Sequence, residues 1–397
     1  MQSPRAKPRL LTLILLTSLA VMSLNMFLPS LSHIATDFGA PYSVVSLSIG
    51  GYLGVSAVLQ LVMGPVSDMI GRRPLILGGL ALFTLASVGC ALAGNVWIFL
   101  GFRMLQAGVV SGMVLSRAVI RDVAEPAEAT RLLAVVGSAM ALAPLLAPML
   151  GGALGEVFGW RSNFWVFALS GAAMFVLSWI DLAETNLKRQ NSFRAQFRTY
   201  PDLLRSGPFW AYCACLIFSI GGFYAYLAGA PQVGEKAFGL SPSSLGLMMG
   251  ATAVGFMAGN LVATRIGARV GTMALIVSGR WASLIGTAGA MGLLAIGLFH
   301  PAVLFGGAVV LGFGNGLTLP GANVGVMSVA PHLAGSASGL SGALTVAAGA
   351  VLTPLVSAMV GGPMGVYVLL GAMAAMSLAG VFAAYVIRNH ERRLQPV

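Results

Sequence analysis

The stretch "GPVSDMIGRRP", residues 64–74, places Asp68, Arg72 and Arg73 between two long apolar runs of a chain that is only 8% charged. Gly71 permits a tight reversal of the backbone, because glycine adopts conformations that other residues avoid. Asp68 can accept hydrogen bonds from arginines or from a helix N-terminus. The stretch therefore predicts a charged turn that joins two apolar helices.

Composition identifies the kind of protein in which such a turn occurs. The chain has 397 residues, is 57% hydrophobic, contains 52 glycines and carries a net charge of +11. A water-soluble domain of this composition would aggregate. A helix needs about 20 apolar residues to cross a bilayer, and such runs recur along the chain. We therefore expect an all-α membrane protein, with twelve transmembrane helices at residues 10–30, 43–63, 75–93, 97–118, 131–154, 162–181, 207–230, 242–263, 273–297, 303–325, 337–360 and 365–387. The basic, apolar start resembles a signal peptide, but its length favours an uncleaved first helix.

The basic residues predict the orientation. Seventeen lysines and arginines fall in loops on the side of the two termini, and two, Arg161 and Lys236, fall in the opposite loops. Retention of Lys and Arg in the cytoplasm predicts a multi-pass membrane protein with both termini inside. The positive charge marks a face towards anionic membrane lipid and requires no nucleic-acid partner.

The longest polar segment predicts a division into two halves. Residues 182–206, "LAETNLKRQNSFRAQFRTYPDLLRS", form a basic bridge that either lies on the cytoplasmic membrane surface or is a solvated linker. It separates a six-helix half at 1–181 from another at 207–397. After the eighth run, "NLVATRIGAR" repeats the spacing of the charged turn, with Thr264, Gly267 and Arg269 in place of Asp68, Gly71 and Arg73. Such an echo suggests duplicated halves around a central path.

Two motifs resemble signatures of the major facilitator superfamily. "GPVSDMIGRRP" resembles the motif between its second and third helices, and the matching residues are Gly64, Asp68, Gly71, Arg72 and Arg73. "LAPLLAPMLGGALG", residues 142–155, resembles the antiporter motif of its fifth helix, in which Pro144 and Pro148 would bend the helix and Pro148, Gly151 and Gly152 are in register. In that family the charged turn latches the halves on the cytoplasmic side when the transporter faces outward. The alternative for the charged turn is that it only fixes topology. The alternative for residues 142–155 is ordinary helix packing.

Shorter segments resemble one branch of the family, the bicyclomycin and chloramphenicol-type drug exporters. They are, in order, "FLPSLSHIATDFG", "RAVIRD", "GWRSNFWVF", "YAYLAGAPQV" and "AGSASGLSGAL". The resemblance implies a multidrug efflux transporter of the bacterial inner membrane, with two pseudo-symmetric six-helix halves and a polyspecific central cavity. It further implies a monomer that exports small lipophilic antibiotics by proton antiport. No catalytic domain, metal-ligand spacing or ATP-binding loop is present, so neither an enzyme nor a cofactor is expected. A proton-independent facilitator or metabolite exporter remains the alternative, and a receptor or scaffold is a third reading.

Polar residues inside the apolar runs are candidate functional groups. Arg103 and Gln106 in "FRMLQAGVVSG" match the family's fourth-helix motif, whose arginine is linked to proton coupling; the alternative is an arginine that reaches the interface. For Arg117 and Arg280, nearer the helix ends, we expect a structural role. Asn25 stands where this branch usually carries an aspartate, and it cannot exchange a proton near neutral pH. It bonds a neighbouring helix, touches substrate, or stands where a native or ancestral aspartate would titrate.

We expect the cavity to be lined by aromatic, methionine and polar residues, because aromatic and Met side chains bury large areas without strict geometry. Helix packing is the alternative for any one of them. The predicted set is Met22, Asn25, Tyr52, Gln60, Arg103, Gln106, Phe223, Tyr224 and Tyr226.

Overall fold

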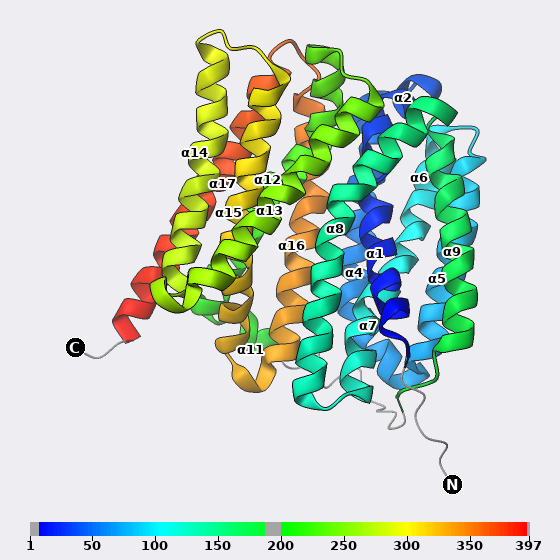
Figure 1. The fold of residues 1–397 in the computed structure, drawn as a ribbon, viewed down its shortest axis with the longest axis vertical. Helices are drawn as coiled ribbons and strands as arrows, with labels where there is room; N and C mark the ends of the chain where they lie inside the picture. The colour runs from blue at the N-terminus through cyan, green and yellow to red at the C-terminus, as the bar shows by residue number, and fades with distance from the viewer. Residues whose placement is uncertain (1–7, 187–199, 395–397) are drawn as a thin grey trace.

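The computed structural model describes residues 8–186 and 200–394 of the chain, and in these ranges it contains helices and no strands. Figure 1 shows the long helices side by side in one bundle, with the first helix beginning and the last helix ending at the same end. We call this the terminal end of the bundle and the other the opposite end.

The first part of the chain forms helices up to Asp181. They are α1 (Leu10–Asn25), η1 (Leu28–Ser30), α2 (Leu31–Asp37), α3 (Tyr42–Val45), α4 (Leu47–Ile70), α5 (Arg72–Ala91), α6 (Val96–Leu105), η2 (Gln106–Val109), α7 (Val110–Val123), α8 (Pro126–Phe158) and α9 (Arg161–Asp181). The remaining helices are α11 (Tyr200–Leu204), α12 (Gly207–Phe238), α13 (Pro242–Val270), α14 (Thr272–Ala295), α15 (Pro301–Ser328), η3 (Pro331–Leu333), α16 (Ala334–Met359) and α17 (Gly365–Leu394).

The predicted all-α membrane fold is confirmed. Within the described ranges, eleven helical segments are long and apolar enough to cross a membrane. The twelfth expected run is α14, which packs between α15 and α17 but is not among the eleven. It carries Arg280 together with several glycines and serines, which lowers its hydropathy.

The helices pack in two groups. In the first, α1 contacts α7, α8 and α9, and α5 packs against α9; in the second, α12 contacts α15, α16 and α17, and α13 and α14 both pack against α15. The groups meet chiefly along two helix pairs, α8 with α13 and α4 with α16. The predicted bridge between them is described only at 182–186 and 200–206, so the rest of it lies outside the described residues.

Close backbone contacts seal the groups together towards the opposite end. A Cβ atom at Gly152 in α8 would overlap the carbonyl of Pro242, and one at Gly246 in α13 would overlap the carbonyl of Pro148. Small residues of this kind let helices approach closely inside a membrane. The Tyr42 hydroxyl also donates to the carbonyl of Ala228 in α12 at 2.8 Å. Any open space between the groups must therefore lie nearer the terminal end.

Candidate functional site

A cavity of about 580 Å³ lies between the two helix groups. Its walls come from α1, α7 and α8 on one side and from α12, α13 and α15 on the other. Pockets of about 300–1,000 Å³ suit drug-sized ligands. A ligand of that size in this cavity would contact both groups.

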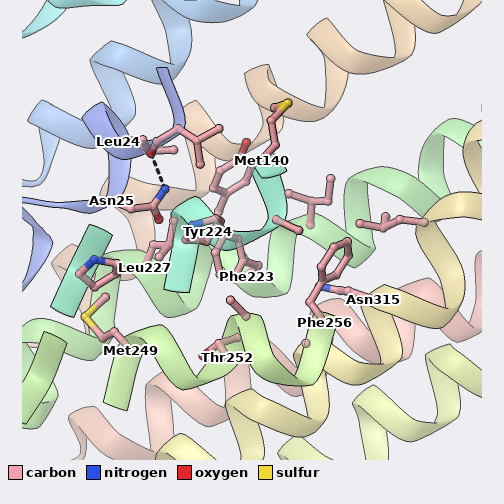
Figure 2. Close-up of a pocket in the computed structure, with 18 of the residues that line it drawn as sticks. Leu24, Asn25, Met140, Phe223, Tyr224, Leu227, Met249, Thr252, Phe256 and Asn315 are labelled. Carbon is pink, nitrogen blue, oxygen red and sulfur yellow. Dashed lines mark hydrogen bonds between the residues drawn. The ribbon is translucent and has the colours of Figure 1, made fainter. Parts of the chain in front are cut away.

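Most of the cavity surface is apolar and adaptable. Phe223 and Tyr224 project from α12, Phe256 comes from α13, and Met140 and Met249 enter from α8 and α13 (Figure 2). Aromatic rings bury a large area, and the unbranched Met side chain adjusts to irregular shapes. Such walls suit ligands that share an apolar body but differ in outline.

Five polar side chains line the cavity: those of Asn25, Arg117, Thr252, Asn315 and Asn323. Asn25 is 3% exposed, and its Nδ2 donates to the carbonyl of Val21 at 2.8 Å. No aspartate or glutamate occurs among the described residues that line this space. The cavity therefore offers hydrogen-bonding groups and one positive charge, but no carboxylate.

The cavity extends towards the terminal end. Arg117 lies six positions before the end of α7 at Val123, and Asn323 five positions before the end of α15 at Ser328. Both helix ends belong to the terminal end, whereas the contacts of α8 with α13 close the opposite end. The structure thus presents the cavity to the side of the termini.

The structure brings three of the nine predicted cavity residues, Asn25, Phe223 and Tyr224, to the cavity wall. Tyr226 instead faces Phe305, with ring centroids 6.1 Å apart. The remaining five lie elsewhere: Met22 packs against the core, Gln60 lies near Gly342 of α16, and Tyr52, Arg103 and Gln106 are buried inside the first helix group.

Arg103 is fully buried without an acidic partner in the described chain. Its guanidinium lies 4.4 Å from the ring centroids of both Phe27 and Tyr52. It donates to Ser23 O and to Gln106 Oε1, each at 2.7 Å. Arginine stacks on aromatic faces in this way because it is planar and weakly hydrated. Arg103 therefore ties α6 to α1 and does not reach the interface.

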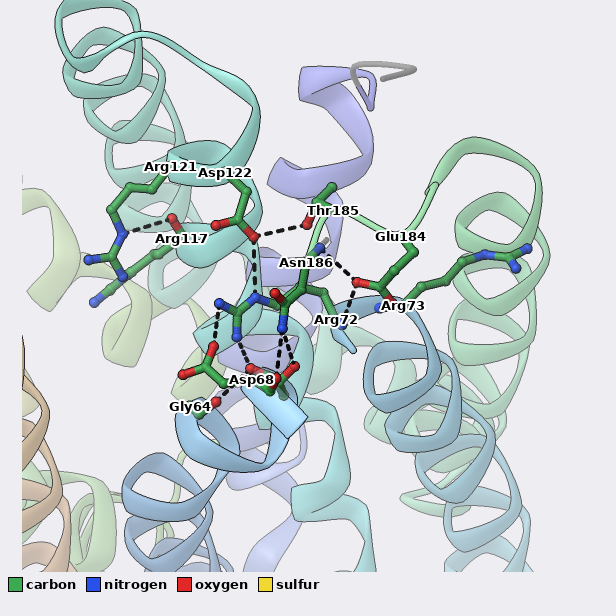
Figure 3. Close-up of polar contacts among 11 residues, drawn as sticks. Gly64, Asp68, Arg72, Arg73, Arg117, Arg121, Asp122, Glu184, Thr185 and Asn186 are labelled. Carbon is green, nitrogen blue, oxygen red and sulfur yellow. Dashed lines mark hydrogen bonds and ion pairs between the residues drawn. The ribbon is translucent and has the colours of Figure 1, made fainter. Parts of the chain in front are cut away.

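The charged turn forms a network inside the first helix group (Figure 3). Arg72 pairs with Asp68 at 2.7 Å and with Asp122 at 3.3 Å, and its side chain is only 11% exposed. The backbone N–H groups of Arg72 and Arg73 donate to Glu184, and Gly71 turns the chain with φ +116°. Among the described residues, these contacts of Asp68, Arg72 and Arg73 are all with the first 186 residues.

The same network extends to neighbouring residues. Arg72 also donates to the Ser67 hydroxyl, and Asn186 Nδ2 donates to the carbonyls of Ser67 and Asp68. Arg73 donates to the Trp179 carbonyl at 2.9 Å. Gly64, the first residue of the motif, has nothing within 4 Å of a Cβ placed on it.

The antiporter-like segment, residues 142–155, lies in the part of α8 that lines the cavity and then contacts α13 of the second group. Pro144 and Pro148 line the cavity. A Cβ at Gly151 would overlap the carbonyl of Met26, whereas Gly152 faces α13. The motif thus combines a cavity wall with a backbone contact between groups.

Arg280, for which a structural role was expected, is fully buried and donates to Asn315 Oδ1 at 2.6 Å and to Thr318 Oγ1 at 3.0 Å. Gly380 leaves room for it, because a Cβ there would lie 3.0 Å from Arg280 Cδ. Sequence reasoning also missed Thr252, Asn315 and Asn323, whose signal is a polar residue within an apolar run.

Comparison with known proteins gives a consistent result. The profile of the Major Facilitator Superfamily matches residues 13–354. The chain is 32% identical over 367 residues to the uncharacterized MFS-type transporter YdgK of Bacillus subtilis (strain 168), covering 90% of each chain. It is 28% identical over 359 residues to multidrug resistance protein D of Escherichia coli (strain K12), covering 87% of each chain.

A solved structure shares the fold. A bacterial homologue of the human lysosomal transporter Spinster, in an inward-facing and occupied conformation, superposes with a TM-score of 0.73 at 15% identity, covering 96% of both chains.

Proposed function

The chain belongs to the major facilitator superfamily, and on that premise we propose that it is a transporter that exports small lipophilic antibiotics by alternating access. The observation that carries this proposal is the apolar cavity between the two helix groups, which is closed at the opposite end. A ligand held there contacts both groups, so a rocking motion of one group against the other can move it across the membrane.

Two observations support a drug as the substrate. The walls are built from aromatic and Met side chains rather than from a dense array of polar groups, and such surfaces bind apolar molecules of varied shape. Multidrug resistance protein D is similar over most of its length, and the short segments resemble those of bicyclomycin and chloramphenicol-type exporters. Phenicols are accordingly the first substrates to test.

We place the terminal end in the cytoplasm of a bacterial cell, with the protein in the inner membrane. The excess of Lys and Arg on that side supports this orientation. The cavity would then face inward, ready to collect drug from the cytoplasm or the inner leaflet. In this proposal the transporter is a monomer surrounded by membrane lipid.

We further propose that the charged turn meets the second helix group only after the terminal end closes. In the inward-facing arrangement Asp68 is 41% exposed on its side chain, while Arg72 is 11% exposed. An exposed carboxylate beside a buried arginine can accept a new donor without dismantling the pair. This supports a latch that forms in the outward-facing state.

A proton-independent mode is favoured by one specific observation. Among the described cavity residues there is no carboxylate, and Asn25 stands where the branch usually carries one. Proton antiport needs a group whose protonation changes between the two facing states. We therefore propose export down the drug gradient as the second candidate mechanism beside proton antiport.

A resistance screen tests the proposed function. The chain is expressed in an efflux-deficient bacterial host, and minimum inhibitory concentrations are measured for a broad antibiotic panel. Raised tolerance to phenicols or other small lipophilic antibiotics is expected. An unchanged profile, with the protein detected in the membrane, would contradict drug export.

A further inference from the structure

Asn25 and Asn315 face the cavity from α1 and α15, on opposite sides of it (Figure 2). They are 3% and 4% exposed, and each has one amide atom held by the protein. Which atom is held follows from the partner. A carbonyl can only accept, so Asn25 must direct its Nδ2 towards Val21 O, 2.8 Å away. Its Oδ1 is left for the cavity.

Asn315 has the reverse arrangement. A guanidinium can only donate, so the atom that lies 2.6 Å from Arg280 Nη2 must be Asn315 Oδ1. Its Nδ2 is left for the cavity. Within the described chain, neither Asn25 Oδ1 nor Asn315 Nδ2 has a recorded protein partner, and neither is among the sealed, unpaired polar atoms. The two asparagines therefore present opposite hydrogen-bonding atoms to the same space.

Arg280 of α14 binds two side chains of α15, those of Asn315 and Thr318. It is fully buried in α14, and no acid pairs with it among the described residues. Its Nε donates to Thr318 Oγ1, which in turn donates to the carbonyl of Gly314 at 2.8 Å. A buried charge inside a membrane helix is costly and usually marks a functional site. Here the charge fixes the orientation of one cavity amide.

We propose, resting on the proposed function, that the cavity selects ligands by the polarity of their hydrogen-bonding groups. Asn315, positioned by Arg280, donates to a carbonyl or nitro oxygen of the ligand. Asn25 accepts from a hydroxyl or amide N–H at the other side. The favoured substrates are neutral molecules with an apolar body and separated donor and acceptor groups. Lipophilic cations are disfavoured, because Arg117 is positive and no described carboxylate lines the cavity.

Binding of two probes to the purified full chain in lipid nanodiscs tests the proposal. Chloramphenicol carries nitro, carbonyl and hydroxyl groups, whereas tetraphenylphosphonium is a cation without them. Asn315→Asp keeps the size of the side chain but removes its N–H donors, so the Kd for chloramphenicol is expected to rise about tenfold, the loss of one hydrogen bond. Tetraphenylphosphonium should bind as well as before or more tightly.

Asn95→Asp is the matched control, since it makes the same chemical change outside the cavity. Asn95 is the exposed N-cap of α6, where its Oδ1 accepts from the Ile98 N–H at 3.0 Å, and an aspartate caps a helix equally well. Its variant is expected to keep chloramphenicol binding within about twofold. Equal binding by Asn315→Asp and the unmodified chain, equal losses in both variants, or no chloramphenicol binding by the unmodified chain would each overturn the proposal.

The positioning role of Arg280 has a separate readout, the ratio of the two Kd values. Arg280→Met frees the Asn315 amide to rotate and is expected to reduce the preference for chloramphenicol. Arg280→Lys, which keeps one donor for Oδ1, should restore most of it. A ratio that is the same in both variants and in the unmodified chain would contradict positioning, even if the variants melt at lower temperature.

Export is measured with the same variants so that the two proposals can fail separately. If the unmodified chain exports chloramphenicol and Asn315→Asp binds it normally, only the selection proposal fails. If binding depends on Asn315 as described but no export occurs, only the proposed function fails.

Discussion

Asn25 is the position at which the effect of a cavity carboxylate on proton coupling can be tested. It lines the cavity and carries no titratable group. We expect Asn25→Asp to make chloramphenicol flux depend on an imposed pH gradient, because a carboxylate in the cavity could load and release a proton. Flux by reconstituted protein, with and without the gradient, is the measurement.

The control for this change is Asn323→Asp, which adds a carboxylate near the mouth of the same cavity. It should gain little dependence on the gradient, because a group near the mouth stays in contact with one side. Strong gradient-driven flux in the unmodified chain would show that another group carries the proton.

Arg103 provides a prediction about stability. Arg103→Lys keeps the buried charge but loses the planar fork that bonds Ser23 and Gln106 and stacks on two rings. We expect a loss of about 1–3 kcal/mol of stability, measured as a lower melting temperature in detergent. Arg269→Lys, at an exposed position of α13, should change it little. Equal melting temperatures would mean that the stacking contributes nothing.

Asp68 tests whether the charged turn acts in transport. Asp68→Asn removes one of two acidic partners of Arg72 and leaves Asp122 in place. The protein should therefore fold and reach the membrane, while chloramphenicol export falls at least several-fold because the latch is weakened. Asp202→Asn in α11 is the control at an exposed acid. Normal export by Asp68→Asn would leave the turn with only a topological role.

At the scale of whole elements, the contact of α8 with α13 is the feature most sensitive to side-chain size. Gly152→Val places a branched side chain against the carbonyl of Pro242. Overpacking of this kind costs about 1–3 kcal/mol, and here the strain falls on the state in which the opposite end of the bundle is closed. We expect export to fall at least tenfold, measured as drug accumulation in cells. Gly101→Ala, with nothing within 4 Å of the added atom, should be harmless.

The helices were predictable from the sequence, but the side of each helix that faces the cavity was not. Twelve apolar runs with loops rich in Gly, Pro and Arg predict where the long helices lie, because bilayer thickness sets the minimum helix length. Several helices continue beyond the expected spans, as α12 does to Phe238 and α13 does to Val270. Phe223 and Tyr224 reach the cavity, whereas Tyr226 points to Phe305, since two positions rotate the side chain to another face of α12. In an apolar helix no hydrophobic periodicity tells the cavity side from the packed side.

The places of the polar residues relative to the cavity were hard to predict for a related reason. Arg103 contacts both Tyr52 and Gln106 inside the first helix group. Asn315 is held by a hydrogen bond from Arg280 of α14. These are contacts between helices distant in sequence, so no local pattern reveals them. Asn25 could be placed because its position near the end of a first helix matched a known motif.

At the scale of the whole molecule, we expect drug to cross the membrane through the cavity between the two helix groups. The measurement that tests this most directly is chloramphenicol flux into proteoliposomes containing the unmodified chain or Gly152→Val, compared with empty liposomes. We predict saturable flux down the drug gradient with the unmodified chain, and flux close to that of empty liposomes with the variant. Flux no greater than that of empty liposomes for the unmodified chain, with the protein shown to be folded and inserted, would contradict the account.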